Sequence, residues 1–388
     1  MLLTQTTLGN VSKGGKGNYG IAASAVDYSD ELYTYLRITD IKDDGTIDFG
    51  GLKSVNDEKA ANYLLQPNDI VFARTGASTG RNYFYDGSDG QFVYAGFLIK
   101  FSIDPDKVNP KYVKYYCLSQ EYKGWIASYN TGSTRGNINA KTLAQMPLVL
   151  PERMQQDKMV DILSSIERKI KENEKINKNL EQQAVAVFNK FYAASTNRQP
   201  FTTLINVLGG GTPKTGNPEF WDGSILFFTP KDVGTPYTFK TEKYITELGL
   251  KHCNSRLYPT NTTFVTARGT VGKISLAGVP MAMNQSCYAL TSEIVDPLLV
   301  YFYVLKAVNA LKHKASGAVF DAIVTRDFDG EIINILSDTD SEAALSIIKP
   351  MMEVIHNNSK ENMRLSAARD TLLPKLMSGE LDVSGIDL

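Results

Sequence analysis

A long stretch with helical periodicity and no interior glycine or proline constrains the fold of this chain more than any other feature. It extends from Pro151, a residue suited to the first helical position, to about Tyr192. Apolar residues recur along it with the spacing of a coiled-coil seam: Met159, Leu163, Ile166, Ile170, Leu180, Ala184, Val187 and Phe191. At 1.5 Å per residue the helix would be roughly 60 Å long, far beyond an average globular helix. The stretch therefore predicts a helical spacer with a specified partner.

A second helical pattern, from Ser341 to Met377, is the expected partner. Both patterns are polar in the middle, at Asn173 and Asn177 in the first and at Ser359, Asn362 and Ser366 in the second. Polar seam residues cost stability but fix register and partner choice, which favours pairing of the two helices over the alternative that each caps its own domain. Proline disrupts helix interiors. We therefore expect a kink or late start near Pro350 and a bend or stop near Pro374.

Each long helix follows a block of about 150 residues, and the two blocks resemble each other in plan. Three residue pairs match at an offset of 192: Pro67 and Pro259, Phe72 and Phe264, and Gly80 and Gly272. Each block has a strand entering a small-residue loop, then another strand, a helix and a polar loop. The repeated order predicts two related modules of one architecture with different specificity.

Composition excludes several classes of protein. A chain of 388 residues should hold two or three domains, and it has no apolar run long enough to cross a membrane. Cys117, Cys253 and Cys287 are widely spread and have the pattern of a reducing compartment, so we expect a cytoplasmic protein without a zinc site. The balance of 41 basic and 42 acidic residues argues against strong unaided DNA binding, although partners can supply phosphate contacts.

Several motifs resemble one known family. Gly209–Trp221, which reads Gly-Gly-Gly-Thr-Pro-Lys-Thr-Gly-Asn-Pro-Glu-Phe-Trp, and the following Phe227–Val233 resemble the target-recognition domains of type I restriction-modification specificity (S) subunits. Tyr19–Tyr28 and Tyr35–Ile41 resemble another variant of that domain. The stretch Asn177–Gln182 resembles the central region of the family, and Ala368–Glu380 resembles its distal region. The resemblance covers essentially the whole chain.

The resemblance implies an α+β fold: two related mixed α/β target-recognition domains, separated and joined by two long antiparallel coiled-coil helices. The expected domains are residues 1–150 (N-terminal recognition domain), 151–195 (central helix), 196–338 (C-terminal recognition domain) and 339–388 (distal helix and tail). Each recognition domain would read one half of a bipartite site in double-stranded DNA, and the helices would set the spacing between the halves.

The resemblance also implies partners and an absence of catalysis in this subunit. The expected partners are two methyltransferase subunits, docked on the helices, and restriction/translocase (R) subunits, with no membrane. The partner subunits would bind S-adenosylmethionine, ATP and Mg²⁺ and carry out methylation, translocation and cleavage. We expect no catalytic or metal-binding residue in this chain.

Base reading requires side chains that donate to or accept from base edges, typically Arg to guanine and Asn or Gln to adenine. The candidates in loops and at strand ends of the first module are Lys16, Arg37, Arg74, Arg81, Arg135 and Asn137. Those of the second module are Lys214, Lys231, Arg268, Lys273 and Gln285. Arg74 and Arg268 rank first because each lies in a glycine-rich loop that allows close approach of the backbone. An exposed Arg or Lys is otherwise more often a solvated charge, and aromatic residues such as Tyr19, Tyr83 and Phe320 are more often core than stacking groups.

Two alternative functions belong to other classes. A stand-alone DNA-modifying enzyme, either an adenine methyltransferase or a nuclease, would require a cofactor or metal site that the sequence lacks. Asn217-Pro-Glu-Phe220 differs from the Asn/Asp-Pro-Pro-aromatic motif of amino-methyltransferases in its third residue, and no glycine-rich cofactor motif lies nearby. A coiled-coil scaffold agrees with the near-neutral charge, but it leaves the two modules unexplained.

Overall fold

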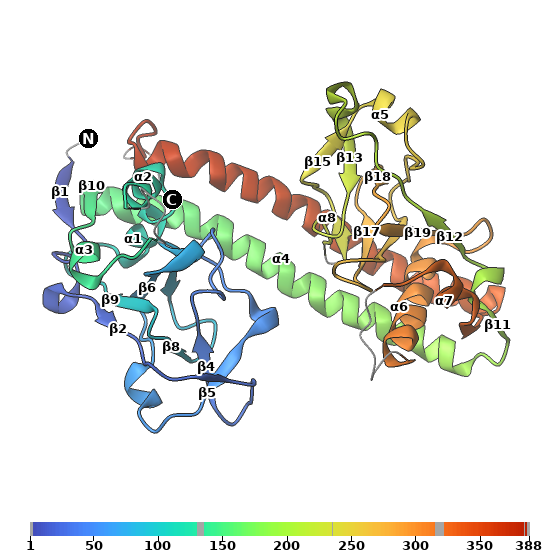
Figure 1. Cartoon of the computed structure of the whole chain (residues 1–388), viewed down its shortest axis with the longest axis horizontal. Coiled ribbons are helices and arrows are strands. Elements are labelled where there is room, and N and C mark those ends of the chain that lie inside the picture. The colour runs from blue at the N-terminus through green and yellow to red at the C-terminus, as the bar shows by residue number, and fades with distance from the viewer. Residues whose placement is uncertain (1–2, 130–135, 235, 315–321, 384, 386–388) are drawn as a thin grey trace. The chain divides into compact units, whose positions relative to one another are not determined.

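The computed structural model describes residues 3–129, 136–234, 236–314, 322–383 and 385, and the chain forms two compact units (Figure 1). Unit 1 consists of Met1–Glu167 and Ala367–Leu388. Unit 2 is Arg168–Ser366. Two long helices, α4 (Arg153–Ala194) and α8 (Asp338–Met377), contribute residues to both units.

Unit 1 contains two four-stranded sheets and a short strand pair. The first sheet is antiparallel, in the order β2 (Asn18–Tyr19), β9 (Leu98–Ser102), β6 (Asp69–Ala73) and β7 (Asn82–Tyr85). The second has the order β3 (Ala25–Val26), β5 (Lys53–Val55), β4 (Tyr33–Leu36) and β8 (Phe92–Tyr94), with β4 and β8 parallel. Antiparallel β1 (Thr4–Thr7) and β10 (Pro147–Leu150) form the pair.

The main core of unit 1 lies between the first sheet and its helices. The short helices are α1 (Pro110–Tyr116), α2 (Gln120–Ala127) and α3 (Ala140–Ala144), each preceded by an Asn or Ser whose side chain accepts a backbone N–H of its first turn. Phe72 and Phe101 of the sheet and Tyr112 of α1 are fully buried, together with Leu163 of α4 and Leu376 of α8. The beginning of α4 and the end of α8 are therefore part of this core.

Unit 2 repeats this plan. Its larger sheet has the order β12 (Asn206–Gly209), β19 (Cys287–Thr291), β16 (Thr263–Thr266), β17 (Ile274–Ala277) and β14 (Tyr237–Thr238). Its smaller sheet has the order β15 (Lys243–Ile245), β13 (Trp221–Phe228) and β18 (Met281–Met283), with β13 and β18 parallel. The remaining strands, β11 (Arg198–Pro200) and β20 (Ile332–Asn334), pair antiparallel, as β1 and β10 do in unit 1.

The helices of unit 2 complete its core. They are α5 (Glu247–Lys251), α6 (Pro297–Lys314) and α7 (Thr325–Asp329), besides the later part of α4 and the earlier part of α8. Phe188 of α4 stacks on Phe302 of α6 with ring centroids 5.4 Å apart. Ile348, Met352 and Ile355 of α8 are buried in the same cluster. The matching strand orders of the two units confirm the duplication predicted from the repeated sequence pattern.

The residues of the predicted seam of α4 are shielded from solvent along the whole helix. These residues are buried or half-buried, whereas Ile176, which lies off the seam, is 46% exposed. The helix begins at Arg153, two residues later than Pro151, and Glu152 accepts the backbone N–H groups of Gln155 and Gln156.

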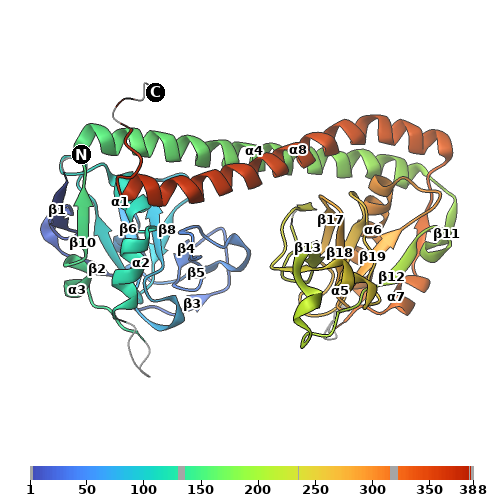
Figure 2. The same ribbon diagram turned by 90° about the horizontal axis from the view of Figure 1, so that it is seen from above.

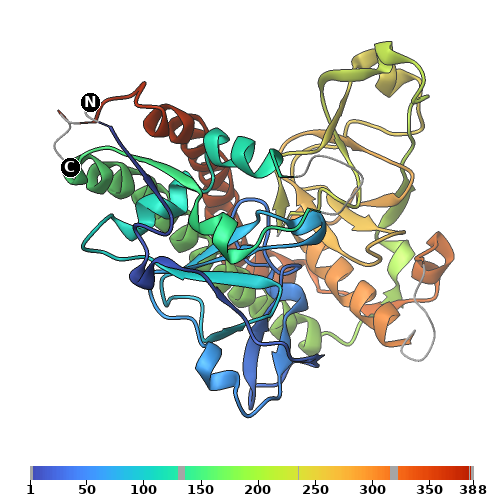
Figure 3. The same cartoon turned by 60° about the vertical axis from the view of Figure 1, so that its left-hand side comes forward.

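A late start of α8 near Pro350 and a stop near Pro374 were wrong predictions, whereas the alternatives of a kink or a bend at these prolines stay predictions. The helix begins at Asp338 and continues through both prolines to Met377. Its C-terminal part is the red helix in Figure 3. A proline has no backbone N–H, so the carbonyl four residues earlier has no helical donor. These carbonyls are those of Ser346, for Pro350, and of Asp370, for Pro374. Both prolines and both of these residues are exposed, so water can satisfy the carbonyls.

The polar middle of the helix pair forms a hydrogen-bonded layer within unit 2, where α4 and α8 run side by side (Figure 2). The Asn173 amide donates to Glu361 Oε2 at 2.7 Å and to Asn362 Oδ1 at 2.8 Å. One turn further along α4, Asn177 accepts from Asn358 Nδ2 at 2.9 Å. Residue numbers rise along one helix as they fall along the other, so the pair is antiparallel. The fold class expected from the sequence is confirmed.

Candidate nucleic-acid interface

The loops at one edge of each larger sheet share a single backbone pattern. In unit 1 the Ala73 N–H donates to the Arg81 carbonyl at 2.8 Å, and the Gly80 N–H donates to the Ala73 carbonyl at 2.9 Å. In unit 2 the same two bonds join Thr266 to Lys273, at 2.9 Å, and Gly272 to Thr266, at 2.8 Å. Arg81 and Lys273 therefore occupy equivalent positions.

The residues that follow Ala73 and Thr266 also make the same pair of backbone hydrogen bonds in both units. The Arg74 N–H donates to the Phe97 carbonyl at 3.1 Å, and the Arg74 carbonyl accepts from the Ile138 N–H at 2.9 Å. In unit 2 Ala267 makes both bonds: its N–H donates to Ser286 at 2.8 Å and its carbonyl accepts from Ile323 at 2.9 Å. The structural equivalent of Arg74 is therefore Ala267.

Arg268 lies one position further along the chain than the equivalent of Arg74. Isolated β-bridges join Thr75 to Asn137 in unit 1 and Arg268 to Ala322 in unit 2, so Arg268 is equivalent to Thr75. Sequence comparison treats Arg74 and Arg268 alike, because each lies in a glycine-rich loop. The backbone hydrogen bonds show that their positions differ by one residue. The side chains of Arg74 and Arg268 therefore point in different directions from the shared backbone.

Gly20 and Gly210 are equivalent positions of the two units at which the backbone lies very close to another strand. A Cβ atom on Gly20 would lie 2.3 Å from the Tyr94 and Ala95 carbonyl oxygens, and one on Gly210 would lie 2.1 Å from the Asn284 carbonyl oxygen. Only glycine allows this approach. Each of these glycines directly follows the last residue of its strand, β2 or β12.

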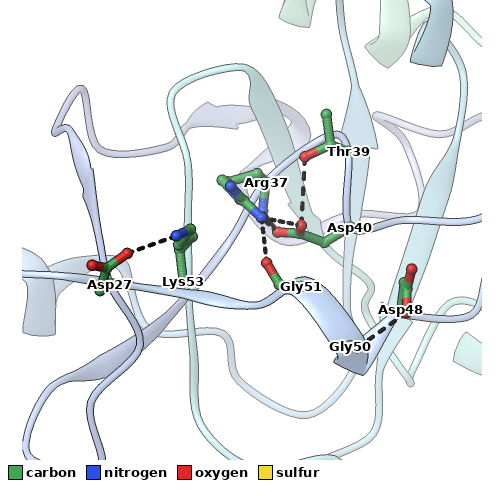
Figure 4. A network of polar contacts seen from close by, with 8 residues as sticks. All are labelled: Asp27, Arg37, Thr39, Asp40, Asp48, Gly50, Gly51 and Lys53. Carbon is green, nitrogen blue, oxygen red and sulfur yellow. Dashed lines mark hydrogen bonds and ion pairs between the residues drawn. The ribbon is translucent and has the colours of Figure 1, made fainter. Parts of the chain in front are cut away.

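Arg37 uses its guanidinium within unit 1 (Figure 4). Its Nε and Nη2 donate to the Asp40 carboxylate at 3.0 and 2.6 Å, and Nη2 also donates to the Gly51 carbonyl at 2.8 Å. Asp40 is 4% exposed, and its hydrogen bond with Arg37 raises the pKa of the guanidinium by stabilising the charged form. The Thr229–Asp232 turn of unit 2 repeats the backbone contact without the arginine, because the Thr229 N–H donates to Asp232 Oδ2 at 2.8 Å. Arg37 therefore stabilises a turn, and its contact with DNA stays a prediction.

Two further candidates are also engaged in ion pairs. The Arg81 Nε lies 2.6 Å from Asp43 Oδ1, and its Nη1 donates to the Ile41 carbonyl at 3.2 Å. The Lys231 ammonium lies 3.4 Å from Glu242 in an exposed pair, which is easily exchanged for another anion. Contact of these two residues with DNA stays a prediction.

Arg74 has different surroundings. Its guanidinium carbon lies 5.4 Å from the centroid of the Tyr19 ring and 5.7 Å from that of Phe97. Its Nη1 donates to Asn137 Oδ1 at 3.1 Å, which brings together two residues predicted from the sequence. The sequence suggests Tyr19 only as a possible stacking residue, and it gives no prediction for Phe97. Phe97 could have been found as an aromatic residue in the short turn between β8 and β9.

Five of the remaining candidates are exposed side chains of loops. Lys16 lies in the glycine-rich loop before β2, and Lys214 lies in the loop before β13. The Gln285 side chain accepts a hydrogen bond from Thr212, whereas those of Arg268 and Lys273 have no hydrogen bond or ion pair within the part of the chain that the structure describes. Arg135 and Phe320 lie outside the described residues. Contact of any of these side chains with DNA stays a prediction.

Two features of the described residues bear on the alternative of an enzyme. Among the described residues, no three His, Cys, Asp or Glu side chains lie together as a group that could hold a metal ion. The Asn217 side chain in the Asn-Pro-Glu-Phe segment accepts the Glu219 N–H at 3.1 Å and thus caps a short 3-10 helix. Within the described helices, none is long and apolar enough to cross a membrane.

Burial controls the reactivity of the cysteines. Cys117 and Cys287 are buried, and burial raises the pKa of both thiols, that of Cys287 to about 12. Cys253 is partly exposed. We expect native protein at pH 8 to react with iodoacetamide first at Cys253, with Cys117 and Cys287 labelled only under denaturing conditions, because the thiolate is the reactive form. Mass spectrometry of timed samples measures this order, and early labelling of Cys287 would contradict it.

The comparisons with known proteins agree with this architecture. The model of the family "Type I restriction modification DNA specificity domain" matches twice, at residues 7–182 and 202–363. The chain belongs to this family. It is 28% identical over 162 residues to the type I restriction enzyme MjaIX specificity subunit of Methanocaldococcus jannaschii, covering 40% of this chain and 38% of that subunit. It is 20% identical to the HindI specificity subunit of Haemophilus influenzae, covering 83% of this chain and 88% of that subunit.

A solved structure has the same fold. The S subunit of a type I restriction-modification system from M. genitalium superposes with a TM-score of 0.58 at 14% identity, covering 97% of this chain and 96% of that one. The family resemblance inferred from the sequence motifs is confirmed.

Proposed function

We propose that this chain is the DNA-specificity subunit of a type I restriction-modification complex and that each unit reads one half of a bipartite site. One observation carries the proposal: two modules with the same backbone bonds present different side chains at the same sheet edge. Arg74 of one module corresponds to Ala267 of the other, and Thr75 corresponds to Arg268. A shared scaffold with different polar groups suits two readers of unlike base sequences.

Catalysis belongs to partner subunits in this proposal. Methyltransferase subunits would bind S-adenosylmethionine and modify the DNA, and restriction subunits would use ATP and Mg²⁺. Docking of the methyltransferase on the long helices is supported by apolar side chains that face solvent there. Ile347 and Val354, seven residues apart on one face of α8, are 44% and 42% exposed. Two exposed apolar side chains on one helix face offer a protein partner apolar contact area.

The experiment is methylome sequencing of a host that expresses this chain with its methyltransferase partner, compared with a strain lacking this chain alone. We expect one bipartite methylation motif to disappear with the chain. Survival of every methylated motif in the strain that lacks it would contradict the proposal. Restoration of the motif by a plasmid copy is the control.

A further inference from the structure

Four side chains of unit 1 converge at one edge of its larger sheet. Tyr19 ends β2, Arg74 follows β6 and Phe97 precedes β9. These three strands are antiparallel neighbours in the order β2-β9-β6, so these ends lie at the same edge. Asn137 joins them through the bridge between its backbone and that of Thr75. We call Tyr19, Arg74, Phe97 and Asn137 the Arg74 cluster.

The cluster holds the guanidinium between two rings. The Arg74 carbon Cζ lies over Tyr19 and over Phe97, at 5.4 and 5.7 Å from the ring centroids, and Nη1 donates to Asn137 at 3.1 Å. The Tyr19 hydroxyl accepts the Ala140 N–H at 3.1 Å, which fixes one ring against the start of α3. A long, flexible side chain is thereby restricted before any ligand arrives, which lowers the entropy lost on binding.

The interactions of Arg74 differ from those of the two arginines of unit 1 that pair with a carboxylate. Arg37 and Arg81 each direct two nitrogens at a carboxylate of unit 1. Arg74 has no carboxylate partner among the described residues, and its buried Nε has no hydrogen-bond partner there. Of its four terminal N–H donors the bond to Asn137 uses one. The Tyr19 and Phe97 rings beside it are 45% and 56% exposed. The cluster therefore faces solvent and has N–H donors that no described residue uses.

The fold does not require these side chains. Strand pairing makes Tyr19 equivalent to Gly209, because Tyr19 pairs with Ile99 as Gly209 pairs with Tyr288. The other three members correspond to Ala267, Ser286 and Ala322 of unit 2. Unit 2 thus builds the same sheet edge with four small residues. Two aromatic rings exposed to solvent and an arginine with unused donors are unfavourable for stability, and unit 2 has none of them at the equivalent edge. A ligand that binds this edge of unit 1 best explains them.

We propose that the Arg74 cluster reads a guanine base in the half-site of unit 1, an inference that rests on the proposed function. Because Nε is buried, the two terminal nitrogens of Arg74 are the ones that face outward. They match the O6 and N7 acceptors that guanine alone presents side by side in the major groove. Tyr19 and Phe97 keep the guanidinium in position, and they act as positioning residues.

The test compares Arg74→Ala with wild type in the complex with the methyltransferase partner. Methylome sequencing of the host should show that R74A loses the requirement for one G·C pair in one half of the motif, while the other half is unchanged. Alanine is the residue that unit 2 has at the equivalent position, so the fold should tolerate it. Lys123→Ala, which removes one exposed charge from unit 1, is the matched control and should leave the motif intact.

A binding measurement separates base reading from phosphate contact. The complex is titrated with the cognate duplex and with a duplex carrying 7-deazaguanine, which lacks the N7 acceptor, at the position identified above. Wild type should bind the modified duplex about 5–150-fold more weakly, whereas R74A should bind both duplexes alike. Equal weakening of every duplex by R74A, or an unchanged motif, would overturn the proposal. A wild-type complex that methylates no bipartite site would instead contradict the proposed function.

Discussion

Replacement of Asp40 by alanine is expected to lower the free energy of unfolding of unit 1 by about 3 kcal/mol. The carboxylate is 4% exposed and accepts the Arg37 backbone N–H, at 2.8 Å, besides two guanidinium N–H groups. Removing it leaves these donors without their acceptor in a largely buried place. The expected loss lies at the low end of the range for a broken buried pair, because the Arg37 side chain is 28% exposed and can regain water.

The matched control is Asp232→Ala in the equivalent turn of unit 2. Asp232 accepts the Thr229 N–H at 2.8 Å, the Thr229 hydroxyl at 2.6 Å and the Glu242 N–H at 2.7 Å, but no arginine. Its loss should cost about 1–2 kcal/mol. The chain has two tryptophans, Trp125 in unit 1 and Trp221 in unit 2, so urea unfolding followed by fluorescence in a single-tryptophan background reports each unit separately. Equal losses in the two turns would contradict the larger loss expected for the carboxylate that pairs with Arg37.

Insertion of seven residues into each long helix is expected to lengthen the gap between the half-sites without changing either half-site. The division between the two units falls between Glu167 and Arg168 in α4 and between Ser366 and Ala367 in α8. Insertions there leave both cores intact. Seven residues preserve the seam, because the apolar pattern repeats every 3.5 residues. They add about 10.5 Å of helix, which corresponds to at most about three base pairs.

Methylome sequencing reads both outcomes of this insertion in one experiment. The two half-site sequences serve as internal controls, since the recognition units are unaltered. A gap that stays the same in a complex that still methylates would refute the idea that the helices set the spacing. A two-residue insertion turns the seam by about 200° and should abolish methylation, because the apolar faces no longer meet.

Features that depend on local periodicity or on repetition were predictable from the sequence. The seam from Met159 to Phe191 was sufficient to predict α4, because a step of 3.5 residues places each member on one face. The repeated order of elements was sufficient to predict two modules of one architecture. The offset of 192 holds for Gly80 and Gly272, but the backbone bonds make Phe72 equivalent to Val265 and not to Phe264. The same local reasoning wrongly allowed a late helix start at Pro350. Whether a proline ends a helix depends on whether the carbonyl that loses its donor is exposed to water or buried, and only the packed structure shows that.

The roles of the individual arginines were decided by tertiary structure. Arg81 meets Asp43 across 38 positions of sequence, and Arg74 meets Asn137 across 63, so no local pattern distinguishes the arginine in an ion pair from the one held between rings. The shift that makes Arg268 the equivalent of Thr75 follows from backbone bonds between distant strands. Sequence by itself therefore determined the long helices, the duplication and the family. The direction and partners of each polar side chain were decided by long-range strand pairing, because that pairing brings together residues that are far apart along the chain.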